Sequence, residues 1–238
     1  MYSAPVPANP DSARKLPAGH QVLTAYIAYN GLVVSNGGQV TGIETSKQNE
    51  VGVKADFGRV AGSLALYEIK KPIGMYRATG DGYTYGNYGE VRNRGIELNV
   101  FGEPVTGVRL NSSIAWMNPE MTKTQGGAYD GNDAVGVPDY QWVVGGEWDI
   151  PGGSGVTATG KVIRSGSQYA DEANKLKVDG WTRLDLGLRY AMPVGQNTLT
   201  WRANLENVTN EKYWASATGG YLTQGDPREF KLSATYDF

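Results

Sequence analysis

The sequence predicts an all-β protein: a segment of an antiparallel transmembrane β-barrel with about ten long strands. Three observations predict this fold. Apolar and polar residues alternate along many segments, these segments are longer than the strands of most soluble sheets, and the connections between them alternate between short and long. We expect the short connections to be periplasmic turns and the long ones to be extracellular loops.

The last segment of the chain shows the alternation most clearly. Its apolar residues are Phe230, Leu232, Ala234, Tyr236 and Phe238. Because successive side chains of a strand point to opposite faces, one face of this strand is apolar and the other is polar. The same reading predicts about ten strands of roughly 9–13 residues each, with the alternating residues at 23–29, 51–57, 96–100, 108–116, 140–150, 184–192, 199–205 and 230–238 and weaker alternation at 60–70 and 156–164.

The connections between these strands differ in length in a regular order. Short ones are expected around Gly58 and at residues 102–107, 151–155 and 193–197. Long ones are expected at residues 30–46, 71–88, 119–137, 170–179 and 208–225. A membrane barrel sorts its connections in this way, whereas a soluble β-sandwich has no reason to do so.

The two faces of the expected strands differ in chemistry. The polar face carries full charges, among them Glu147, Arg183 and Asp185, which a water-filled or plug-facing lumen accommodates. Aromatic residues near the strand ends indicate girdles at the membrane surface, with ordinary core filling as the alternative for each ring. These residues are Tyr29, Trp116, Tyr140, Trp148, Trp181, Tyr190, Tyr236 and Phe238.

Composition limits the classes of partner and site. The chain has 22 Lys and Arg against 24 Asp and Glu, a balance that argues against binding to nucleic acid. It has no cysteine, which excludes disulfides and thiolate metal sites. Residues 1–19 are rich in Pro and Ala, lack the features of a signal peptide and are expected to be loop or disordered. Residues 20–238 are expected to form the barrel segment.

The segments that resemble catalytic or metal-binding motifs do not fit them. Residues 155–162 nearly match a phosphate-binding loop, but Val162 stands where a hydroxyl is needed and a strand is expected in place of the helix. Residues 130–133 lack the terminal Glu of a calcium loop. The one histidine, His20, has no acidic neighbour in the sequence. We therefore expect no catalytic residue, cofactor or metal site, and no enzyme.

Several motifs carry a resemblance to a known family. Residues 204–214, NLENVTNEKYW, resemble the N-L-x-N-x-x-(D/N)-x-x-Y-(W/Y) stretch of TonB-dependent receptors. Residues 226–230 resemble the entry to the last strand of these receptors, and residues 92–98 resemble their G-x-E strand. Residues 166–171 and 181–187 resemble the siderophore-receptor branch. The resemblance covers roughly residues 47–238.

The resemblance implies the C-terminal portion of a 22-stranded outer-membrane barrel that imports ferric siderophores. The implied partners are the ferric siderophore, outer-membrane lipid and the barrel assembly machinery, which reads the terminal Phe238. The TonB complex acts on such receptors through a plug. Neither the plug nor the TonB-contacting box has a counterpart in these 238 residues, so the chain is expected to be incomplete as a transporter.

Ligand contacts are expected on the extracellular loops, because binding residues concentrate on loops that a rigid scaffold holds. An ordinary aromatic residue at the barrel rim is the alternative interpretation for each candidate. The candidates are Tyr83, Tyr85, Tyr129, Tyr213, Trp214 and Tyr221.

Two other kinds of protein stay open at this point. One is a self-contained small barrel, a porin or an outer-membrane enzyme, in which the first strand would pair with residues 230–238. The other is a soluble β-sandwich or lectin-like binding module, in which the apolar faces would be covered by a second sheet. Strand pairing at the two edges and exposure of the apolar faces distinguish these alternatives.

Overall fold

The structure, a computed structural model, describes residues 21–36, 39–80, 82–152, 155–218 and 221–237. The expectations for residues 1–19, His20 and Phe238 therefore lie outside the described residues. A 3-10 turn, η2, covers Gln125–Gly127. The strands are β1 (Gln21–Asn36), β2 (Gln39–Asp56), β3 (Val60–Thr79), β4 (Gly82–Val105), β5 (Val108–Lys123), β6 (Tyr140–Asp149), β7 (Val156–Ser165), β8 (Gln168–Tyr169), β9 (Lys177–Val178), β10 (Trp181–Val194), β11 (Asn197–Glu206), β12 (Trp214–Thr218), β13 (Tyr221–Gln224) and β14 (Glu229–Asp237).

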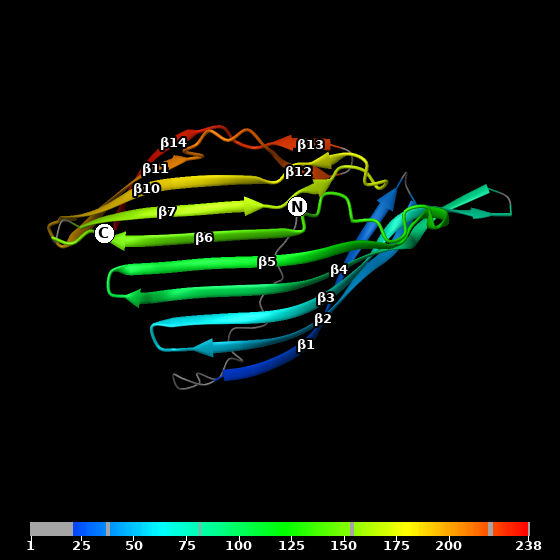
Figure 1. Ribbon diagram of the computed structural model, residues 1–238, viewed down its shortest axis with the longest axis horizontal. Coiled ribbons are helices and arrows are strands. Elements are labelled where there is room, and N and C mark those ends of the chain that lie inside the picture. The colour runs from blue at the N-terminus through cyan, green and yellow to red at the C-terminus, as the bar shows by residue number, and fades with distance from the viewer. Residues whose placement is uncertain (1–20, 37–38, 81, 153–154, 219–220, 238) are drawn as a thin grey trace.

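Ten of these strands form one antiparallel sheet, in the order β1-β2-β3-β4-β5-β6-β7-β10-β11-β14. The ten strands expected from alternation are thus confirmed one by one. Figure 1 shows a single curved layer, like a wall cut from a barrel. Within the described part of the chain, β1 and β14 are the two edges and do not pair with each other. The wall is therefore open, and the self-contained small barrel is not what these strands form.

The short connections all lie at one end of the sheet, as expected (Figure 1). Each of the four places a glycine at positive φ, among them Gly58 at 83°, Gly107 at 83°, Gly152 at 114° and Gly195 at 65°. A tight reversal between two strands needs this conformation, which glycine adopts without steric cost. The opposite end of the sheet carries the long hairpins and loops.

Several segments expected to be loops are strands instead. β1 and β2 continue to Asn36 and Gln39, and β3 and β4 continue to Thr79 and Gly82, so residues 30–46 and 71–88 are mostly hairpin. Residues 170–179 and 208–225 likewise contain parts of the small pairs β8–β9 and β12–β13. Beyond a membrane both faces of a strand meet water. The alternation is then lost although the backbone pairing persists.

The apolar faces of the strands are open to the surroundings. Trp148 on β6 is 50% exposed and Phe230 on β14 is 64% exposed. Among the described strands, the main sheet is one layer and no second sheet covers these residues, which rules out the soluble β-sandwich. Within the described residues, no helix is long and apolar enough to cross a membrane. An uncovered apolar face on a continuous sheet is the arrangement that hydrocarbon stabilises.

The expected aromatic girdles are partly correct. Trp116, Trp148, Tyr190 and Tyr236 are exposed on the apolar face, as the girdle requires. Trp181 is an exception. It lies an even number of residues from Asp185 on β10, and so faces the charged side of the sheet. Its even spacing from Arg183 and Asp185 in the sequence already indicates the charged face, whereas the girdle assignment rested only on its place at a strand end.

Candidate functional site

Charged side chains pair across the concave, inner face of the wall near the short turns. The guanidinium of Arg109 on β5 binds both oxygens of Asp149 at 2.6 and 2.7 Å, and it donates to Glu147 at 3.0 Å. Arg189 on β10 binds the same Glu147 at 2.9 Å, and Thr157 donates to Asp149 at 2.7 Å. Charge-assisted, two-pronged pairs of this kind hold four neighbouring strands in register.

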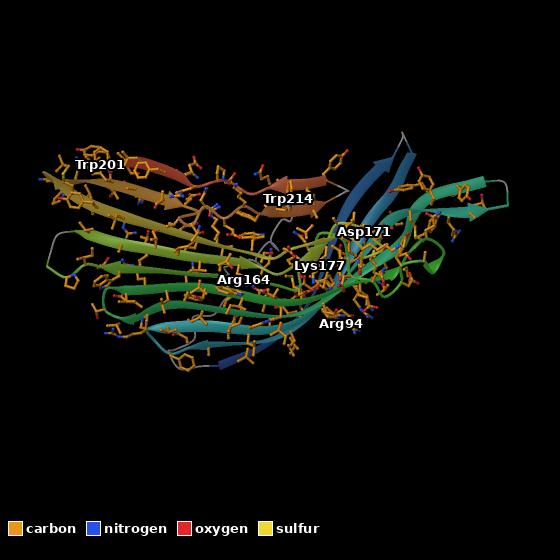
Figure 2. All side chains as sticks on the ribbon, turned by 45° about the horizontal axis from the view of Figure 1, so that its top comes forward. Arg94, Arg164, Asp171, Lys177, Trp201 and Trp214 are labelled. Carbon is orange, nitrogen blue, oxygen red and sulfur yellow. The ribbon has the colours of Figure 1, made fainter. Side chains whose placement is uncertain are left out.

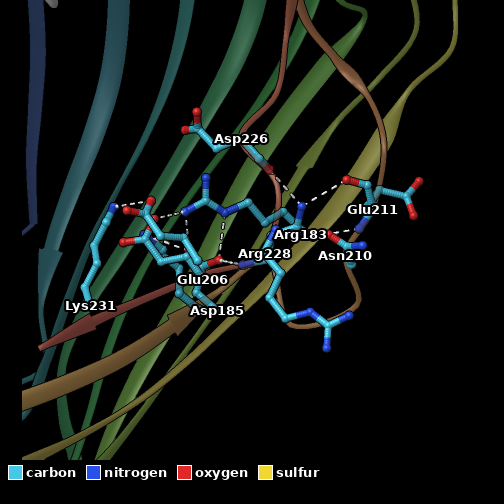
Figure 3. A network of polar contacts seen from close by, with 11 residues as sticks. Arg183, Asp185, Glu206, Asn210, Glu211, Asp226, Arg228 and Lys231 are labelled. Atoms are coloured by element: carbon cyan, nitrogen blue, oxygen red, sulfur yellow. Dashed lines mark hydrogen bonds and ion pairs between the residues drawn. The ribbon is translucent and has the colours of Figure 1, made fainter.

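A second network occupies the inner face nearer the long loops (Figure 3). Arg183 bridges Asp185 and Glu206, each at 2.7 Å, and so links β10 with β11. Lys161 reaches Asp185 from β7 at 3.2 Å, and Lys231 reaches Glu206 from β14 at 3.1 Å. The lumen-facing charges expected from the sequence are therefore present, and they are largely neutralised within the wall.

A shallow cavity of about 550 Å³ lies on this inner face between the two networks. Its lining combines cations and carboxylates with Gly145, which leaves room above the sheet. Such a mixed, open surface suits the docking of another polar protein surface better than the enclosure of a small apolar ligand.

The long connection from β11 to β14 is anchored at its base by Asn207. This side chain is fully buried. Its amide donates to the carbonyl oxygens of Glu211 and Asp226, both at 2.9 Å, and its Oδ1 accepts from the Glu211 N–H at 2.8 Å. The Asn207 N–H donates to Asp185 at 2.9 Å, which ties the loop to the inner network.

Above this anchor, aromatic rings line the start of the β12–β13 hairpin. Tyr213 stacks on Trp181 with ring centroids 4.1 Å apart, and its ring covers Gly225. Trp214 is exposed next to it, and Tyr221, at the start of β13, is 80% exposed. Three of the six predicted contact residues, Tyr213, Trp214 and Tyr221, thus lie on one hairpin at the rim.

The β3–β4 hairpin carries a second aromatic group and projects farthest from the wall (Figure 1). The rings of Tyr76 and Tyr85 meet edge to face with centroids 5.0 Å apart. Arg77 lies 4.3 Å above the ring of Tyr88. Tyr83, near the hairpin end, is 72% exposed. The predicted residues Tyr83 and Tyr85 are therefore accompanied by an arginine and two further tyrosines.

Tyr129 belongs to a third element, the loop between β5 and β6. Its N–H donates to Thr124 Oγ1, and Asp130 accepts from the N–H and the hydroxyl of Thr124 at 2.7 and 2.8 Å. The Asp130 carboxylate therefore caps a turn. Across the described part of the chain, no cluster of His, Asp and Glu suited to a metal ion is present.

This loop is joined to the loop between β7 and β10. Asn174 accepts from the Asp133 N–H at 2.8 Å and donates to the Asp133 carbonyl at 3.0 Å, and Asn132 donates to Glu172 at 2.8 Å. Asp171 caps its own loop by accepting from the N–H groups of Lys175 and Leu176. The two loops therefore form one ordered surface at the rim.

The six predicted contact residues thus fall on three separate rim elements. Figure 2 shows Trp214 on its own hairpin, away from the projecting β3–β4 hairpin. Tyr76, Arg77 and Tyr88 were missed by the sequence analysis. The tyrosines stand on both sides of the sequence Gly-Asp-Gly at residues 80–82, and this hairpin signal could have revealed that they face one another.

Comparison with known proteins decides the family. The family described as "TonB dependent receptor-like, beta-barrel" matches residues 15–208. The chain belongs to the TonB-dependent receptor β-barrel family. The expected family, barrel fold and outer-membrane location are thereby confirmed, and the open wall of ten strands is part of such a receptor barrel.

Individual receptors resemble the chain over most of its length. It is 60% identical over 212 residues to the ferrichrome receptor FcuA of Yersinia enterocolitica, covering 88% of the chain and 28% of that protein. It is 26% identical over 227 residues to the ferrichrome outer membrane transporter/phage receptor of Escherichia coli, covering 91% and 30%. The chain therefore spans less than a third of these receptors.

A solved receptor shows the same arrangement of strands. The ferric preacinetobactin receptor BauA of Acinetobacter baumannii superposes with a TM-score of 0.82 and 37% identity. The match covers 92% of the chain and 34% of that receptor. The relatives are receptors and transporters by name, so the transport class expected from the motifs is supported at the level of the family.

Proposed function

We propose that the chain forms the C-terminal wall, residues 20–238, of an outer-membrane receptor that imports ferric siderophores with energy from TonB. One observation carries the choice of ligand. The relative that shares 60% identity is named a ferrichrome receptor, whereas the ferric preacinetobactin receptor shares 37%. A ferrichrome-type complex is therefore the favoured cargo. The iron belongs to that cargo, and the wall needs no iron ligand of its own.

The inner face supports the role of this wall around a plug. Arg109, Glu147, Arg183 and Asp185 are held in place by mutual ion pairs, which leaves a preorganised polar surface. A plug supplied by sequence outside these 238 residues would pack against this surface. TonB would act on that plug, and only through it on the wall. Such a polar contact is easier to rearrange during transport than an apolar core.

The rim residues supply the proposed ligand contacts, as large rings offer contact area at a small cost in side-chain entropy. Tyr83 and Tyr221 are the most exposed of the six, and Trp214 is exposed beside the stacked Tyr213. Tyr85 contributes from the β3–β4 hairpin, and Tyr129 contributes from the loop between β5 and β6. The three elements would converge on the cargo once the rest of the barrel is in place.

The outward face and the C-terminus support the remaining partners. The exposed apolar rows of β6, β10 and β14 would contact outer-membrane lipid. The barrel assembly machinery is proposed to read the terminal strand with Phe238, which lies outside the described residues. The pairing of the inner-face cations Arg109, Lys161 and Arg183 with carboxylates argues against nucleic acid as a partner.

The proposal is tested by uptake of iron-55 ferrichrome in cells that lack their own ferrichrome receptor and express the full-length receptor. Uptake should require TonB and should exceed uptake of ferric preacinetobactin. Tyr83→Ala and Tyr221→Ala should each weaken ferrichrome binding about three- to tenfold, the usual effect of losing one aromatic contact.

Tyr190→Ala is the matched control, since it removes a tyrosine from the outward face near the short turns. Heat-modifiable migration in gels would verify that each variant folds. Uptake without TonB, or no ferrichrome uptake by the unmodified receptor, would contradict the proposed function. Full uptake by both rim variants would contradict only the residue assignment.

A further inference from the structure

The ring of Tyr213 joins the wall to the β12–β13 hairpin. On the wall side it stacks on Trp181, the first residue of β10, with an angle of 28° between the two ring planes. On the hairpin side it covers Gly225, where even a methyl group would clash with the ring. The Gly225 N–H also donates to the Tyr213 carbonyl oxygen at 2.8 Å. The close approach of ring and backbone therefore requires a glycine at this position.

Trp181 depends on this stack for its orientation. Its indole N–H is buried, and within the described part of the chain it has no hydrogen-bond acceptor. No polar contact of that N–H therefore fixes the ring. A stacked pair of aromatic rings contributes stabilisation beyond the apolar area that it buries. We therefore expect the Trp181–Tyr213 pair to hold the start of the hairpin against β10.

The segment between β11 and the hairpin is attached to the inner face at both of its ends. At its start, the Asn207 N–H donates to Asp185 at 2.9 Å. At its end, the Tyr213 hydroxyl interacts with the guanidinium of Arg183, which lies two residues after Trp181 on the same face of β10. Arg183 in turn binds Asp185 at 2.7 Å. The hairpin thus starts from a fixed point on the wall.

Trp214, the next residue, has the opposite character. Its side chain is 45% exposed, whereas Tyr213 is half-buried. Successive residues of an extended chain point to opposite sides, so a Tyr213 ring turned toward the wall directs Trp214 away from it. The pairing of β12 with β13 becomes irregular directly after Trp214, which stands opposite Gln224. The position of Trp214 therefore depends on Tyr213 more than on the strand ladder.

We propose that Tyr213 is a positioning residue, which stacks on Trp181 and thereby holds Trp214 where it contacts the ferric siderophore. Tyr213 acts through its neighbour, because its own ring is already occupied by Trp181 and Gly225. The inference rests on the proposed function. It divides two adjacent aromatic residues of the rim into one that contacts the cargo and one that supports the contact.

Binding of iron-55 ferrichrome to cells kept on ice, where transport does not proceed, tests the proposal on the full-length receptor. Tyr213→Leu and Trp214→Ala should each weaken binding about three- to tenfold, the share of one aromatic contact. Because both changes remove the same contact, the double variant should bind no more weakly than the weaker single variant. Tyr213→Phe keeps the stack and loses only the hydroxyl, so it should weaken binding about twofold.

Tyr83→Ala is the matched control for this comparison. Tyr83 lies on the separate β3–β4 hairpin, so its loss should multiply with the loss caused by Tyr213→Leu. Trp181→Leu removes the same stack from the wall side and should reproduce the effect of Tyr213→Leu. It replaces that variant if Tyr213→Leu does not fold.

Two results would overturn the proposal: unchanged binding by Tyr213→Leu, or losses that multiply when Tyr213→Leu is combined with Trp214→Ala. If the unmodified receptor binds no ferrichrome, the proposed function fails by itself. Hydrogen exchange of residues 214–217 then decides the positioning role without any ligand. Exchange about tenfold faster in Tyr213→Leu than in the unmodified receptor would support that role, and equal exchange would overturn it.

Discussion

Asn207 shows how one buried polar residue can fix the base of a long loop. Its backbone is in the left-handed region, with φ of 49°, which Asn tolerates better than most residues. All of its side-chain hydrogen-bonding groups have partners in the connection it anchors. The second Asn of the N-L-x-N motif thus has a physical role: it satisfies the backbone groups of Glu211 and Asp226 where water has no access.

Replacing this residue should therefore destabilise the rim. Asn207→Ala removes three buried hydrogen bonds and should lower the free energy of unfolding of the full-length receptor by about 3 kcal/mol. Urea unfolding in detergent measures the effect. Asn210→Ala is the matched control, since Asn210 has a similar φ of 53° but is exposed and accepts one hydrogen bond. Equal losses in the two variants would contradict the anchoring role.

The carboxyl group of Asp133, in the rim loop after β5, is expected to make the stability of that loop depend on pH. Burial raises the pKa of its carboxyl above 3.8, the charge of Asp139 adds to this rise, and Lys177 opposes it. The folded loop therefore favours the neutral carboxyl. The stability from this group is complete below pH 3.8 and is lost as the pH rises toward the raised value.

Asp133→Asn should accordingly stabilise the loop at pH 7 and have little effect near pH 3. The substitution keeps the size of the side chain and the backbone hydrogen bonds to Asn174. Hydrogen exchange of residues 124–139, corrected for the intrinsic rate at each pH, measures it. Asp139→Asn should give a smaller gain of the same sign. Faster exchange of Asp133→Asn at pH 7 would contradict the prediction.

At the scale of the elements, a glycine lets an aromatic ring lie flat on the sheet. Gly95 on β4 stands opposite Tyr67 on β3 and Met117 on β5. A methyl group at Gly95 would clash with the Tyr67 ring and with the carbonyl oxygen of Trp116. The glycine of the G-x-E strand is thus needed because the neighbouring strand places a ring over it.

Gly95→Ala should lower the stability of the barrel by about 1–3 kcal/mol, the usual cost of overpacking. Gly145→Ala is a suitable comparison, because a methyl there would meet its nearest atom, the Asn111 carbonyl oxygen, at 3.5 Å. The temperature at which the receptor loses heat-modifiable migration reports both effects. A tolerated Gly95→Ala would show that the ring moves aside without cost.

The success of the sequence analysis also differs between elements. Alternation predicted all ten wall strands, because hydrocarbon on one face and water on the other impose it on the sequence. It did not predict the outer halves of β3 and β4, where both faces meet water. Trp181 was assigned to the wrong face for another reason: its place at a strand end was used without its even spacing from Arg183 and Asp185.

At the scale of the whole molecule, the wall has two open edges, β1 and β14. Their backbone groups would be unpaired in hydrocarbon, at a cost of several kcal/mol for each unsatisfied group. These 238 residues, expressed with a signal peptide, should therefore not yield a heat-modifiable, protease-resistant band in outer membranes, whereas the full-length receptor should. Such a band from the segment alone would show that the edges pair by another route.

The site was less predictable than the fold. The aromatic candidates were chosen for their place in loops, and the structure puts them on three elements whose spacing depends on how far each hairpin extends. Arg164 could not have been recognised as outward-facing from its charge, since charge predicted the lumen. Only its register opposite Trp142 and Thr182 assigns it to the apolar side.

The length of β4 sets how far this receptor extends from the cell. Its 24 residues span about 80 Å along the strand, whereas a tilted crossing of the bilayer takes about 10 residues. The tip with Tyr83 therefore stands among the sugars and large molecules that crowd the cell exterior. Under the proposed function, a scarce iron complex would be met there before it had diffused down to the barrel mouth. By the same geometry, an antibody raised against this tip would find it accessible on intact cells.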